Sequence, residues 1–168
     1  MEFEYRLVTE EDASAYLDFF RSIAGESDNL ACSAEEADAM SIEDERSFIR
    51  NSAASGWFSA VAVLDGRICG SCDIRVSQRE RIRHRGEMGI AVRKEYWGKG
   101  VAQHIFDTAV SEARRRGIRK ISLTVRSDNE RAKAFYRKNG FSLCGTDRML
   151  FLIDGKYVDG ELYDLILD

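Results

Sequence analysis

The stretch that decides the fold runs from Gly86 to Ala102 and reads Gly-Glu-Met-Gly-Ile-Ala-Val-Arg-Lys-Glu-Tyr-Trp-Gly-Lys-Gly-Val-Ala. Its first part alternates two kinds of side chain: Met88, Ile90 and Val92 are apolar, whereas Gly89 and Ala91 between them are small. A period of two is typical of a strand. The pattern therefore predicts a strand with one apolar face and one face that a ligand or another backbone approaches closely.

A glycine turn and a helix follow this strand. Gly98 and Gly100 allow the backbone to turn and to come close to a ligand. An apolar residue then recurs at every fourth position, as in one ridge of a helix: Val101, Ile105, Ala109 and Ala113. Free amide groups at the start of such a helix, together with the positive end of its dipole, favour an anion such as a phosphate.

Two common phosphate-binding loops do not fit this turn. A Walker loop needs Ser or Thr after its Lys, but Lys99 is followed by Gly. A dinucleotide fingerprint that begins at Gly98 needs Gly or Ala where Gln103 stands. The glycines alone also fit an ordinary strand-to-helix turn, so the interpretation depends on a second motif.

The turn resembles the acetyl-CoA pyrophosphate loop of the GNAT superfamily of N-acetyltransferases. That loop has Arg or Gln, two residues, Gly, any residue, and then Gly or Ala. Gly100 and Ala102 match this pattern, and Trp97 stands where the family has Arg or Gln. The departure puts coenzyme affinity in question more than coenzyme identity, because backbone amides can still bind the phosphates.

The second motif covers residues 129–141, which read Asn-Glu-Arg-Ala-Lys-Ala-Phe-Tyr-Arg-Lys-Asn-Gly-Phe. The residues from Ser127 to Glu130 form a capping-box pattern that predicts the start of a helix. Asn129 and Tyr136, seven positions apart, lie on one side of that helix. The letters resemble the second GNAT signature, which has this Asn, Ala, Tyr and Gly-Phe in the same order. The stretch from the start of the first motif to the end of the second covers about a third of the chain.

The resemblance implies an α/β fold in a single domain, residues 1–168. We expect a twisted mixed β-sheet flanked by helices, with central parallel strands that splay apart. The patterns along the chain agree with this order of elements. Strands are predicted at 3–8, 57–64, 68–76 and 118–125, and two more strands end at 153 and 167. Helices are predicted at 13–23 and 101–116; a further helix ends at about 54, and another begins at 130.

The resemblance also assigns roles by position. The pantetheine strand would be Ile90, Ala91 and Val92; the pyrophosphate loop would be Trp97, Gly98, Lys99, Gly100, Val101 and Ala102; and Asn129 would contact the coenzyme near the pantetheine. Tyr136 would be the general acid, since a phenol with a reference pKa of ~10 has a proton to give at neutral pH; a packing aromatic is the alternative. Glu87 is the candidate general base, with a water relay or a surface role as alternatives.

Composition places the chain among globular proteins. It has 168 residues, 44% hydrophobic and 32% charged, which suits one domain with its own core. No apolar run approaches the ~20 residues that cross a bilayer, and the start lacks a signal-peptide pattern, so we expect no membrane partner and a cytoplasmic location. A net charge of -4 argues against nucleic acid as the main partner.

The spacing of Cys69 and Cys72 matches a redox or zinc half-site. No second Cys or His pair completes a zinc site, and the spacing in a strand puts the two thiols on opposite faces. We therefore expect reduced packing cysteines and no metal.

The acceptor is indicated only by charge. The segment from Gly25 to Glu45 contains eight acidic residues and no Lys or Arg. It is either a solvated surface or the rim of a site for a cationic amine. We expect acetyl-CoA as cosubstrate and a small-molecule amine, cationic or polyamine-like, as acceptor. A protein or peptide amino terminus, or a silent acyl-CoA-binding regulator, are the alternatives, and the resemblance adds a homodimer through the last two strands.

Overall fold

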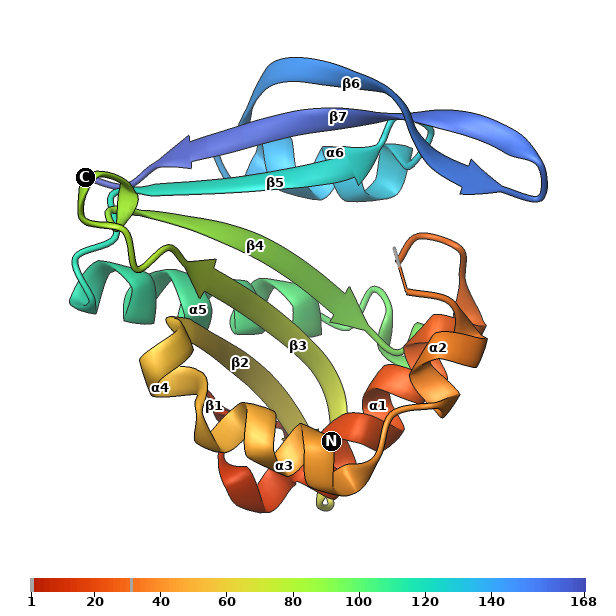
Figure 1. The fold of residues 1–168 in the computed structure, drawn as a ribbon, viewed down its shortest axis with the longest axis vertical. Helices are drawn as coiled ribbons and strands as arrows, with labels where there is room; N and C mark the ends of the chain where they lie inside the picture. Colours follow the sequence, from red (N-terminus) through yellow and green to blue (C-terminus); the bar gives the residue numbers. More distant parts are fainter. Residues whose placement is uncertain (1, 31) are drawn as a thin grey trace.

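Seven strands form one mixed sheet in the computed structural model, which describes residues 2–30 and 32–168; residues 1 and 31, the second within the acidic segment, lie outside it. The strand order is β1-β2-β3-β4-β5-β7-β6 (Figure 1). The strands are β1 (Glu4–Leu7), β2 (Trp57–Leu64), β3 (Arg67–Val76), β4 (Arg85–Val92), β5 (Lys120–Arg126), β6 (Ser142–Ile153) and β7 (Lys156–Ile166). Neighbouring strands are antiparallel except β4 and β5, which are parallel.

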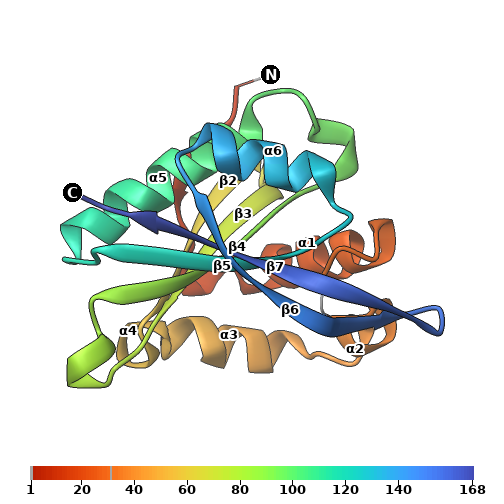
Figure 2. The same ribbon diagram turned by 90° about the horizontal axis from the view of Figure 1, so that it is seen from above.

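Helices cover both faces of this sheet (Figure 2). One face carries α5 (Val101–Arg115) and α6 (Glu130–Lys138). The other carries α1 (Ala13–Glu26), α2 (Ala34–Asp38), α3 (Ile42–Arg50) and α4 (Ser52–Ser55), and short 3-10 helices lie at Glu10–Asp12, Glu80–Ile82 and Lys94–Tyr96 (η1, η2 and η3). The predicted α/β architecture is confirmed.

The single helix predicted to end near Ala54 is instead divided into α2, α3 and α4. Ser33 accepts a hydrogen bond from the Glu36 amide and starts α2, and Ser41 accepts one from the Asp44 amide and starts α3. A serine that caps a helix has extended backbone angles, so each of these positions interrupts a longer helix.

The two parallel strands separate soon after they begin. β4 pairs with β5 only from Arg85 to Glu87, opposite Lys120 to Ser122. Beyond Glu87, β4 remains paired with β3 as far as Val92, whereas β5 turns away and pairs with β7 (Figure 1). The edge of β4 from Met88 to Val92 that faces β5 is therefore free of a neighbouring strand.

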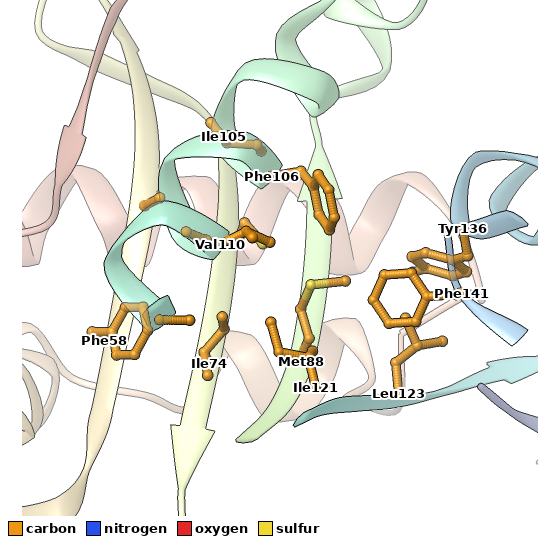
Figure 3. Packing of buried hydrophobic residues seen from close by; sticks show 14 of the residues in the cluster. Phe58, Ile74, Met88, Ile105, Phe106, Val110, Ile121, Leu123, Tyr136 and Phe141 are labelled. Atoms are coloured by element: carbon orange, nitrogen blue, oxygen red, sulfur yellow. The ribbon is translucent and has the colours of Figure 1, made fainter. Parts of the chain in front are cut away.

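The predicted apolar ridge of α5 forms the centre of the main core. Val101, Ile105, Ala109 and Ala113 are at most 1% exposed. They lie with Ile74, Met88 and Ile121 of the sheet, as the close view of the core shows (Figure 3). Burial of one such aliphatic side chain contributes roughly 1.5–3 kcal/mol, so this ridge holds α5, and with it the preceding loop, in place.

The two cysteines of β3 lie in the same core, which corrects the prediction that they occupy opposite faces. The pairing of β2 with β3 shifts between Ala62 and Val63, which leaves Cys69 as an extra residue in a β-bulge. An extra residue reverses the alternation of faces beyond it. Cys69 and Cys72 are therefore both buried beneath α5, and both are free thiols.

Candidate active site

The loop between β4 and α5 presents backbone donors at one end of the free edge. Gly98 and Gly100 have φ of +73° and +80°, and Gly100 caps the helix that begins at Val101. In the described part of the chain, the N–H groups of Gly98, Gly100, Val101 and Ala102 donate no hydrogen bond. Unpaired N–H groups at a helix start form a site for an anion.

Helix α1 fixes the shape of this loop from behind. The Arg93 side chain is only 2% exposed; its Nε donates to the Ile68 carbonyl at 2.8 Å and its Nη2 to Asp18 Oδ2 at 2.7 Å. Glu26 Oε2 accepts a hydrogen bond of 2.6 Å from the Lys94 amide. The loop is thus tied to a rigid element on the far face of the sheet, which preorganises its free amides.

Trp97 connects the two diverging halves. Its indole Nε1 donates to the Val92 carbonyl at 2.7 Å, and the Arg131 guanidinium of α6 lies 3.7 Å from the centre of its ring. In the described residues Arg131 forms no ion pair, and partial burial lowers the pKa of its guanidinium. The site therefore has a stacked arginine without an anionic partner, beside the loop in which Trp97 replaces the family's Arg or Gln.

The predicted pantetheine strand lies along the free edge. Ile90 and Val92 pack partly against the α5 core, whereas Ala91 packs against the cluster under α1. Gly89, which shares the face of Ala91, is exposed, and a Cβ placed there would meet no atom within 4 Å. The two faces differ as the sequence predicts, and the small-residue face is open at Gly89.

Asn129, and not Ser127, caps α6, which corrects the predicted capping box. Asn129 Oδ1 accepts a hydrogen bond of 3.2 Å from the Ala132 amide, and the helix begins at Glu130. An Asn cap uses its carbonyl oxygen and leaves its amide group as a donor. That donor remains available for a ligand at the start of α6.

Tyr136 lies in an aromatic cluster beside the free edge of β4. Its ring is 5.6 Å from that of Phe141 and 5.9 Å from that of Phe135, and Figure 3 shows Tyr136 and Phe141 together above Leu123. The side chain is 7% exposed, and its hydroxyl makes no hydrogen bond within the described residues. Burial, with a smaller contribution from Cys72, raises the pKa of Tyr136, so the phenol stays protonated at neutral pH.

The opposite face of the sheet carries acids. Glu87 is exposed at the last position where β4 pairs with β5. Two positions further, Gly89 pairs with Asp73 of β3, and Asp73 pairs with Ser59 of β2. Directly paired residues share a face. Ser59, Asp73 and Gly89 therefore form one row that points away from the α5 core, and Glu87 lies next to this row.

Helices α1 and α3 add two residues to this row that the sequence analysis does not single out. The Tyr16 hydroxyl donates to Asp73 Oδ1 at 2.8 Å. Glu45 is only 5% exposed, and its Oε1 is buried without a hydrogen-bond partner among the described residues. Burial raises the pKa of both carboxyls, and the Asp73 charge raises that of Glu45 further. Only the acidic composition of the Gly25 to Glu45 segment could have indicated Glu45.

Three of the other seven acids of that segment cap a helix or anchor the loop. Glu36 accepts from the Ser33 amide at 2.8 Å, Asp44 accepts from the Ser41 hydroxyl, and Glu26 holds the loop as described above. Caps and anchors thus account for part of the charge asymmetry.

Comparison with known proteins identifies the family. The family model described as Acetyltransferase (GNAT) family matches residues 17–141, and the chain belongs to this family. Over 100 residues it is 35% identical to the L-amino acid N-acetyltransferase AaaT of Escherichia coli (strain K12). The matched region covers 59% of this chain and 62% of AaaT. The chain thus matches about three fifths of that relative's length.

Solved structures give the same result for the fold. An acetyltransferase of the GNAT family from Streptococcus pneumoniae is 28% identical, with 99% of this chain and 100% of that chain covered and a TM-score of 0.93. yncA from Salmonella typhimurium, solved with its cofactor acetyl-CoA, is 16% identical. The match covers 100% of this chain and 95% of yncA, with a TM-score of 0.86. The predicted family is confirmed, and these relatives support the prediction of an N-acetyltransferase.

Two further observations concern the described residues only. They contain no helix that is both long and apolar enough for a bilayer. They also contain no group of three or more His, Cys, Asp or Glu side chains that could hold a metal ion. The cytoplasmic location and the absence of a metal stay predictions.

Proposed function

We propose that the protein is an acetyl-CoA-dependent N-acetyltransferase that acetylates a primary amine of a small, cationic molecule. The observation that carries this proposal is the separation of β4 from β5 after Glu87, with free loop amides at one end and Tyr136 across the opening. The coenzyme supplies the acetyl thioester. Every other requirement of the reaction falls to side chains and backbone groups of this chain.

The residues divide into binding and proton-transfer groups. The amides of Gly98, Gly100, Val101 and Ala102 bind the pyrophosphate, and Arg131 on Trp97 supplies a cation that the loop itself lacks. The free edge from Ile90 to Val92 and the Asn129 amide group hold the pantetheine arm.

Acetyl transfer needs a neutral amine and a proton for the departing thiolate. The amine nitrogen forms a bond to the thioester carbonyl carbon, and the carbon–sulfur bond breaks. Tyr136 gives its proton to the sulfur, because burial keeps its phenol protonated. Glu87, exposed on the acceptor face, removes a proton from the amine and passes it to solvent.

The direct test measures thiol release from acetyl-CoA with a panel of polyamines, amino acids, aminoglycosides and peptide amino termini, and identifies each product by mass spectrometry. We expect a new amide on a small amine. A product only on peptides would select the alternative of a protein amino-terminal acetyltransferase, which two relatives' names also suggest: N-alpha-acetyltransferase 30 of Schizosaccharomyces pombe and the ribosomal protein bS18-alanine N-acetyltransferase of Bacillus subtilis. Coenzyme binding without any product would select the silent regulator.

We also propose a homodimer through the β6–β7 hairpin. β6 is an edge strand, and the hairpin exposes large apolar side chains: Leu143, Met149, Leu150, Leu152, Tyr157 and Ile166. Exposed apolar groups of this size gather at association surfaces. Light scattering on the purified protein should give twice the 19.1 kDa chain mass, and the mass of a single chain would refute the homodimer.

A further inference from the structure

The Glu45 carboxyl is buried at a cost that nothing in the described chain offsets. It comes from α3, is 5% exposed, and leaves Oε1 without a hydrogen bond. An acceptor in this state loses its hydration and gains no protein partner. A buried group without a partner needs an explanation, and a ligand that completes the site is one.

A second carboxyl, Asp73, is connected to the same helices. Helix α1 packs against α3, and the hydroxyl of Tyr16 in α1 donates to Asp73 Oδ1 at 2.8 Å. The Asp73 charge also raises the pKa of Glu45. Glu45 and Asp73 are called the acid pair below. Asp73 is partly exposed, so the pair can be reached from solvent. Among the described residues neither member forms a salt bridge, and the Arg75 charge lowers the pKa of Asp73 against the effect of burial.

The acid pair lies beside the place where transfer would occur. Asp73 pairs directly with Gly89, and Gly89 is two positions beyond the last contact of β4 with β5. Neighbouring strands are about 5 Å apart, so Asp73 is roughly that far from the free edge of β4. Because Gly89 has no side chain, the space beside Asp73 at the free edge of β4 is open on this face.

We propose that the acid pair binds a cationic group of the acceptor that is joined by a short alkyl chain to the amine that is acetylated. The acceptor class is therefore a diamine. This inference rests on the proposed function and assigns its substrate class. Two carboxylates without a cation between them repel each other, and an ammonium group between them satisfies both.

The bound cation is the distant group and not the reacting amine. Carboxylates hold an ammonium group in its protonated form, whereas attack on a thioester requires the neutral amine. The separation of the acid pair from the free edge of β4 allows the two ends of one molecule to have different protonation states. Glu87, at the divergence of the strands, is then left for the reacting end.

The test compares putrescine with n-butylamine, which has the same carbon chain but no second amine. The variants are Glu45→Gln and Asp73→Asn, and Glu43→Gln is the control, because Glu43 is an exposed acid on the same helix. Each carboxyl variant should lower kcat/KM for putrescine by roughly 30-fold or more, with a much smaller loss for n-butylamine. Glu43→Gln should match the wild type with both amines.

Two further readouts separate binding of a cation from a structural role. Calorimetry with acetyl-CoA should give the wild-type affinity in both variants, because neither residue contacts the loop. The ratio of kcat/KM for putrescine to kcat/KM for n-butylamine should rise with pH in the wild type as the acid pair ionises. In the double variant, which carries both Glu45→Gln and Asp73→Asn, this ratio should not change with pH.

The outcomes distinguish the two proposals. A wild type that does not prefer putrescine to n-butylamine, or variants that lose activity equally with both, overturns the acid pair as a cation site. Acetylation of other amines in the same assay would leave the proposed function standing. Failure to bind acetyl-CoA and to acetylate any amine overturns the proposed function itself.

Discussion

The loop after β4 and the acid pair are built differently. The loop offers backbone amides, and its residues from Trp97 to Ala102 are consecutive. The acid pair depends on side chains from α3 and β3, with Tyr16 of α1 bonded to a residue 57 positions away. A loop of consecutive residues binds with backbone amides, so its geometry is the same for every acceptor. A site made of side chains from separate elements can change its choice of acceptor through a single substitution.

This difference predicts where the chain tolerates change. Substitutions on the coenzyme side should alter binding or turnover with every acceptor, because all acceptors use the same thioester. Substitutions on the acid side should alter the choice of acceptor and the stability of the fold. The following predictions test that division.

The largest effect should come from Gly100→Val. Gly100 has a φ of +80°, which a β-branched residue rarely adopts, although the nearest atom to a new Cβ would be 4.0 Å away. The loop would therefore change its backbone path to relieve strain, and its amides would no longer converge. We expect coenzyme affinity to fall at least about 100-fold, a loss of the order of 3 kcal/mol, measured by calorimetry with acetyl-CoA.

The control for this variant is Gly25→Ala. Gly25 lies in α1, has no positive φ, and has no atom within 4 Å of a new Cβ. It should bind acetyl-CoA as the wild type does. A folded Gly100→Val protein with wild-type affinity would remove the loop from the coenzyme site.

Tyr136→Phe should have the next largest effect. It removes only the hydroxyl and keeps the ring in its cluster with Phe135 and Phe141. General acid assistance is worth ~10²–10⁴-fold, so kcat should fall within that range while coenzyme affinity changes little. Pre-steady-state thiol release, under conditions where transfer limits the rate, is the measurement.

Tyr163→Phe is a matched control. Tyr163 is a buried tyrosine whose ring centre lies 6.5 Å from that of Tyr136, and the Tyr163 hydroxyl donates to Glu161. It should lose roughly 1 kcal/mol of stability with little change in kcat. Equal rates for Tyr136→Phe and the wild type would assign Tyr136 to packing alone.

The same division explains how much the sequence predicts. The glycine turn, the α5 ridge and the Asn129 motif depend on neighbouring residues, so their periods and spacings are visible in the letters. The position of Cys69 depends on a bulge, which a shift in pairing with β2 creates and a periodic pattern cannot show. Asp73 and Glu45 meet only after α3 packs under the sheet, so no spacing indicates them.

The smallest effect, a change in stability, concerns Glu45→Gln. Burial and Asp73 raise the pKa of Glu45 in the fold above its unfolded value. A carboxyl with a raised pKa stabilises the fold fully below its unfolded pKa of ~4.3, and this contribution is lost as pH rises through the folded value. Above the folded pKa, the ionised, unpartnered Glu45 therefore destabilises the protein. Gln cannot ionise, and its amide can donate to Asp73, so the variant should be more stable by about 1 kcal/mol at pH 7.

That gain should shrink as pH falls toward ~4, where Glu45 is protonated in both states. Urea unfolding of the wild type, Glu45→Gln and the exposed control Glu43→Gln at several pH values measures it, with putrescine absent throughout. Putrescine should then raise the stability of the wild type more than that of Glu45→Gln, because a ligand that binds only the folded state adds to its stability. If the wild-type and Glu45→Gln curves stay parallel across the pH range, Glu45 has a partner in solution, and the acid pair loses the unpaired charge on which its cation binding depends.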